Sequence, residues 1–153
     1  MKRIFTFFCC LILVFSATMH ASAVGANIEL QEILYSQTEN LGNGITVTTE
    51  ISVPSSQARA TDKSATCSQT FKDGSTVIAV ISIRGTFRYD GSTVSVVSKS
   101  VTQTTTYNGW SYSQTSFTSS GGTITLSGKL TRLFSLNVPV NMSLTCDKDG
   151  NIS

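Results

Sequence analysis

The segment Thr76-Val77-Ile78-Ala79-Val80-Ile81-Ser82-Ile83-Arg84-Gly85-Thr86-Phe87-Arg88-Tyr89 decides the fold class of this chain. Apolar or aromatic side chains fill nearly every odd position, while the even positions of its second half are polar or charged. A period of two is that of a β-strand with one buried face. Because Ile78 and Val80 make the first half apolar on both faces, this strand is predicted to be central in a sheet.

Turn signals and further alternating segments extend the pattern in both directions. Asp73-Gly74 and Asp90-Gly91 flank the strand, and such pairs favour tight hairpin turns. Val94 and Val96 keep one phase and Val97 the other, which predicts a one-residue bulge between them. The remaining alternating segments are 45–53, 65–71, 110–117, 124–130 and 136–146.

About seven strands with short turns predict an all-β fold, namely an antiparallel β-sandwich of immunoglobulin-like architecture or a partly open barrel. The sequence hallmarks of immunoglobulins are missing, because Leu144 stands where the tyrosine corner would place a Tyr before Cys146. The predicted domain spans residues 45–153. For residues 24–44 a short amphipathic helix capped by Asn27 fits the spacing, and a strand fits nearly as well.

The first 23 residues have the three parts of an export signal. Lys2 and Arg3 precede an apolar run over residues 4–15, and Ala21-Ser22-Ala23 matches the small-residue pattern that signal peptidase cleaves. The run is too short to span a bilayer, which needs about 20 residues. We therefore expect cleavage after Ala23, secretion to the extracellular space and no membrane insertion.

Cleavage would leave Cys67 and Cys146 as the only cysteines. Both are in phase with apolar neighbours and should point into the core. Because an exported protein with one pair of cysteines usually oxidises them, we expect a disulfide between these two residues; two buried thiols are the alternative.

Composition argues against several classes of function. Without Lys2 and Arg3 the chain holds nine basic and nine acidic residues, so no nucleic-acid partner is expected. The only histidine, His20, also leaves with the signal, which excludes Ser-His-Asp and Cys-His sites and His-containing zinc sites. The aspartates fall in turns, where backbone chemistry explains them. We expect no catalytic residues, metal or cofactor, and hence no enzyme.

The aromatic residues Tyr107, Trp110 and Tyr112 surround the Asn108-Gly109 turn. Exposed aromatic rings of this kind can stack on sugars, so the three are candidate ligand-binding residues. The alternative is that Trp110 and Tyr112 share one face and close an end of the core.

Two segments, Gly85–Gly91 and Leu144–Asn151, carry a resemblance. Together with Trp110 they resemble an uncharacterised group of small secreted β-rich proteins of Gram-positive bacteria, over residues 65–153. The group has no assigned activity, cofactor or site, so the resemblance implies a fold and an exported product only.

The leading interpretation is a secreted, non-catalytic surface-interaction or structural module of unknown partner. A cell-wall polysaccharide or another extracellular protein are the candidate partners. One alternative is a carbohydrate- or cell-wall-binding module using the aromatic cluster. Another is a pore-forming or assembling β protein, suggested by the Ser/Thr-rich alternation over residues 92–128.

Overall fold

The computed structural model describes residues 30–55, 61–105, 107, 109–132 and 136–153. The predicted signal peptide and cleavage site lie outside these residues. The described chain contains eight strands and no helix. They are β1 (Gln31–Gly42), β2 (Ile45–Pro54), β3 (Asp62–Asp73), β4 (Thr76–Tyr89), β5 (Val94–Thr105), β6 (Trp110–Ser120), β7 (Thr123–Arg132) and β8 (Leu136–Thr145).

The strands form two antiparallel sheets, one of five strands in the order β1-β2-β3-β4-β5 and one of three in the order β6-β7-β8. Each strand pairs only with its neighbours in the chain, so each sheet is a meander. The connection from β5 to β6 carries the chain from one sheet to the other. The predicted all-β architecture of two antiparallel sheets is confirmed, with β4 in the interior of the larger sheet.

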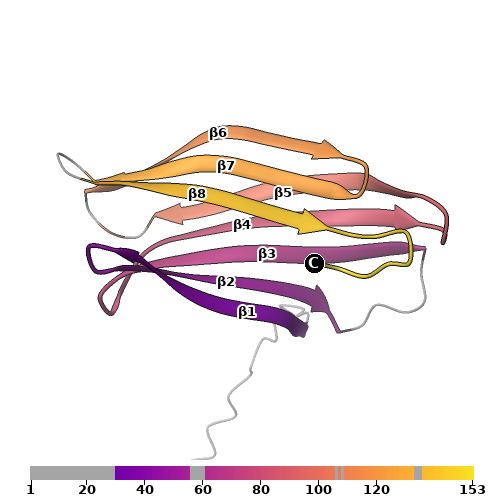
Figure 1. The fold of residues 1–153 in the computed structure, drawn as a ribbon, viewed down its shortest axis with the longest axis horizontal. Coiled ribbons are helices and arrows are strands. Elements are labelled where there is room, and N and C mark those ends of the chain that lie inside the picture. The colour runs from indigo at the N-terminus through magenta and orange to yellow at the C-terminus, as the bar shows by residue number, and fades with distance from the viewer. Residues whose placement is uncertain (1–29, 56–60, 106, 108, 133–135) are drawn as a thin grey trace, which may run out of the picture.

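The two sheets are offset rather than centred on one another (Figure 1). Strand β8 packs over β3 and β4, while β6 and β7 pack over β5. Strands β1 and β2 therefore extend past the small sheet on one side, and β6 is the outermost strand on the other. The core lies where the sheets overlap, and its largest fully buried side chains include Phe71, Phe87, Ile81, Ile83, Leu126 and Leu144.

The described part of the N-terminal segment is a strand, one of the two structures that its spacing allowed, and the strand count is eight rather than about seven. Strand β1 pairs with β2 along its length, and the hydroxyls of Thr38 and Thr48 lie 2.9 Å apart across this pair. Every residue of β1 is exposed. An amphipathic helix is held by burying its apolar face, and no core surface is offered to this segment.

The predicted bulge is present in β5. Thr86 pairs with Ser98 and Phe87 pairs with Val96, which leaves Val97 as the extra residue. On β4, Gly85 permits an unusually close approach between the sheets. A Cβ at this position would lie 2.4 Å from Cδ1 of Ile124 on β7 and 2.8 Å from Cζ of Phe87.

Serine and threonine hydroxyls pair across strands on the outward faces. The Ser68 and Ser82 hydroxyl oxygens are 2.8 Å apart, and those of Thr118 and Thr125 are also 2.8 Å apart. Such cross-strand pairs contribute modestly to sheet stability. They explain how a chain rich in serine and threonine forms regular sheets rather than a disordered stalk.

Candidate functional site

The three candidate aromatic residues do not form one exposed platform. Trp110, the first residue of β6, is only 7% exposed, and the Arg132 guanidinium lies 6.0 Å from its ring centroid. Tyr112 is half-buried, and burial raises the pKa of its phenol. Tyr107 alone is exposed, at 50%. Trp110 belongs to the buried core cluster and Tyr112 packs against it, as expected of rings that close one end of the core.

Cys67 and Cys146 point into the core as predicted, but no disulfide joins them in the structure. Both thiols are free and 1% exposed. Burial raises the pKa of Cys67 to about 11 and also raises the pKa of Cys146, whose thiol donates to the Asp147 carbonyl at 3.4 Å. A raised pKa keeps both sulfurs in the unreactive thiol form.

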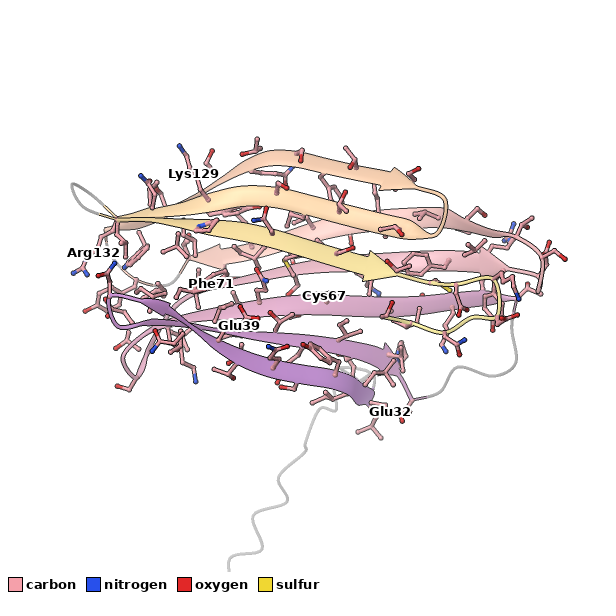
Figure 2. All side chains as sticks on the ribbon, in the orientation of Figure 1. Glu32, Glu39, Cys67, Phe71, Lys129 and Arg132 are labelled. Atoms are coloured by element: carbon pink, nitrogen blue, oxygen red, sulfur yellow. The ribbon has the colours of Figure 1, made fainter. Side chains whose placement is uncertain are left out.

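The relative register of the sheets accounts for the absence of a disulfide between Cys67 and Cys146 in the structure. Gln69 Nε2 of β3 donates to the Asn141 carbonyl of β8 at 3.1 Å, which places these two residues opposite each other. Cys67 is two residues from Gln69, whereas Cys146 is five from Asn141, so the cysteines are offset by about 10 Å along the strands. A disulfide requires Cα atoms within about 7 Å of each other. Figure 2 labels Cys67 on β3.

The C-terminal turn holds its acidic residues in backbone hydrogen bonds. The Asp147 carboxylate accepts from the backbone nitrogens of Asp149 and Asn151, at 2.9 and 2.8 Å, and from the Asn151 side chain. These bonds lower the pKa of Asp147, the Asn151 side chain contributing most. The chain then returns along β8, where Cys146 pairs with Ile152. The turn is therefore an element of structure, as the sequence predicted.

No group of three or more His, Cys, Asp or Glu side chains suited to a metal ion occurs among the described residues. Within the same part of the chain, no helix is long and apolar enough to cross a membrane. Three hollows lined by described residues lie along the overhanging edge of the larger sheet.

We name this surface the mouth. It is the opening between β1 and β2 on one side and β8 with the C-terminal residues on the other. Its largest hollow has a volume of about 420 Å³. This hollow is lined by Leu34, Tyr35, Ile51, Ile152 and Ser153.

Two smaller hollows continue the mouth toward the β1–β2 turn. One, of about 190 Å³, is lined by residues of β1, β2, β3 and β8, including Glu39, Phe71 and Pro139. The other, of about 100 Å³, lies between Leu41 and the start of β8. The mouth thus runs along most of β1, and the lining of its 420 Å³ hollow is mainly apolar.

Exposed apolar side chains concentrate at this edge. Of the eight large hydrophobic residues that are exposed in the described chain, five belong to β1 or immediately precede it. They are Leu30, Ile33, Leu34, Tyr35 and Leu41. Figure 2 labels two acidic side chains of the same strand, Glu32 and Glu39. The sequence did not indicate a site at this edge. The spacing of these apolar residues also suited an amphipathic helix, and such a helix would have buried them in the core.

No protein family, curated protein or solved structure matches this chain. A function for this chain must therefore be inferred from its residues and their arrangement.

Proposed function

We propose that this protein is an exported, non-catalytic interaction module that binds its partner at the mouth and along β1. The observation that carries the proposal is the group of exposed apolar residues on β1. Exposed apolar side chains gathered at one edge of a protein mark a contact site, whereas isolated exposed hydrophobics are ordinary. Tyr35 and Leu34 are 44% and 45% exposed, and they border the 420 Å³ hollow.

The backbone edge of β1 offers a partner a second means of binding beside the same apolar residues. Among the described strands β1 is the outermost of its sheet, so no described strand pairs with one side of its backbone. An unpaired edge recruits an extended partner by main-chain hydrogen bonds, and nearby apolar pockets supply selectivity.

The carboxylates support a non-catalytic role. The described aspartates with resolved shifts are Asp62, Asp90 and Asp147, and each has a lowered pKa. Hydrogen bonds from Arg88, Thr93 and Asn151 respectively are the largest causes. A general acid needs a raised pKa near the working pH, which is the opposite direction.

Photo-crosslinking tests the proposal. The protein carries p-benzoylphenylalanine in place of Tyr35 and is irradiated in a culture of the producing cells. We expect one or a few discrete adducts, whose yield falls when Leu34→Ser is added. The matched control carries the probe in place of the exposed Lys129 of β7, the central strand of the smaller sheet, and should give none. Equal adducts from both positions, or none from position 35, would show that the mouth is not the contact surface.

A further inference from the structure

Acidic and basic residues are segregated between the two ends of the larger sheet. All four glutamates fall between residues 29 and 50, and no Lys or Arg occurs between Arg3 and Arg59. Within the β1–β2 pair the charged residues are Glu32, Glu39 and Glu50. Within the β4–β5 pair they are Arg84, Arg88 and Lys99, and of these Arg88 forms an ion pair with Asp62 of β3 at 2.8 Å. The charged residues of the first strand pair are therefore all acidic, and those of the last pair are all basic.

The two ends are also alike in length and orientation. Strands β1 and β5 are the two outer strands and contain 12 residues each. Because a five-stranded antiparallel meander has an odd number of strands, β1 and β5 run in the same direction. If a second copy is related to the first by simple translation, β1 of the second copy lies beside β5 of the first as a parallel pair. The core faces of the two sheets then lie on the same side.

The offset of the two sheets makes these ends complementary in shape. At the β5 end, Lys99 reaches across to β6, where its Nζ donates to the Phe117 carbonyl at 3.1 Å and lies 4.7 Å from the Phe117 ring centroid. Strand β6 extends past β5, and its Tyr112 and Phe117 are only partly buried. At the other end, β1 and β2 project without a covering strand. A projecting β1 would thus lie beneath the β6 of the next copy.

We propose that the partner at the mouth is a second copy of this chain, bound head to tail with β1 of one copy beside β5 of the next. This inference rests on the proposed function and names its partner. A contact between two different surface patches forms a ring only if the rotation between copies closes, so copies related by translation form an open filament. A symmetric β1–β1 pair is disfavoured because it would bring Glu32 and Glu39 of both copies together.

The charge argument predicts how assembly responds to salt and to substitution. Sedimentation velocity of the chain from residue 24 onward should show species that grow with protein concentration. The association constant should fall roughly tenfold between about 0.02 and about 0.5 M NaCl, because screening shortens with ionic strength. A chain that stays monomeric at every concentration in low salt would overturn the proposal.

Two variants test the polarity of the contact. The β1 variant carries Glu32→Lys and Glu39→Lys, and the β5 variant carries Val97→Glu and Gln103→Glu; all four positions are exposed. We expect each variant alone to be monomeric and an equal mixture to associate, because each still offers one unaltered edge. Circular dichroism confirms that both variants remain folded. A β5 variant that dimerises alone would instead establish the symmetric β1–β1 pair.

The crosslinking experiment separates this inference from the proposed function. If the partner is another copy, adducts from position 35 have twice the mass of the chain and map to β5 or β6. Adducts with a different macromolecule would uphold the mouth as a contact surface but overturn self-assembly. Absence of any adduct would overturn both.

Discussion

Substitution of Gly85 by Ala tests how tightly the two sheets approach each other. The added Cβ would lie 2.4 Å from Ile124 Cδ1 and 2.8 Å from Phe87 Cζ, and both of these side chains are 0% exposed. Ordinary contacts between carbon atoms are about 3.5–4.0 Å long, so neighbouring atoms must move within a packed core. Overpacking of this kind costs about 1–3 kcal/mol. Where a backbone position can accept alanine without strain, Gly→Ala often stabilises a protein by about 0.4–1 kcal/mol. At position 85 we expect the same substitution to lower the free energy of unfolding instead.

A double-mutant cycle isolates the responsible contact. Ile124→Val deletes the clashing Cδ1 and alone should cost about 1 kcal/mol. If Gly85→Ala alone costs about 2 kcal/mol, the double variant should cost about 2 kcal/mol rather than the additive ~3, because the deleted atom removes the strain while the Phe87 contact persists. Urea unfolding, followed by the fluorescence of Trp110, measures each free energy of unfolding. Costs that add to within about 0.5 kcal/mol would refute the close approach of Gly85 to Ile124.

Three further predictions concern burial and charge. Trp110 should emit at short wavelength and stay unchanged on titration with polysaccharides, since it is 7% exposed; red emission that shifts with a glycan would restore the sugar-binding interpretation. A thiol reagent should react slowly with Cys67 and Cys146 in the folded protein and should label both in denaturant, because both are buried and free; no labelling in denaturant would mean that they are oxidised. The pKa values of Asp90 and Asp147 are lower in the folded than in the unfolded chain, so their contribution is complete above about pH 4 and lost as pH falls through the lowered pKa values. The urea midpoint should therefore decline in acid, and a midpoint that is constant down to about pH 2 would contradict this linkage.

Alternation along single strands made the fold class predictable from sequence. The phase change before Val97 even located a bulge, because one extra residue moves every later side chain to the other face. Strand β8, which contains Pro139, is an edge strand, the position in a sheet where proline is tolerated. These features are local, so a single sequence contains them.

The features that sequence reasoning missed depend on how separate elements are placed. Phase showed that Cys67 and Cys146 face the core, but it could not fix the offset between β3 and β8. The apolar residues near Tyr35 suited a helix or a strand equally, and only pairing with β2 decides between them. The mouth exists because one sheet has five strands and the other three, which no local pattern records.

The meander topology has a consequence for folding kinetics. Because each strand pairs with the strand next to it in the chain, every ladder can form by closing a short loop, and loop-closure entropy rises with loop length. Only the docking of one sheet on the other, such as β8 on β3, joins distant parts of the chain. We therefore expect the two meander sheets to form first and then to dock on each other in one step. Folding should be faster than for sandwiches whose neighbouring strands are far apart in sequence.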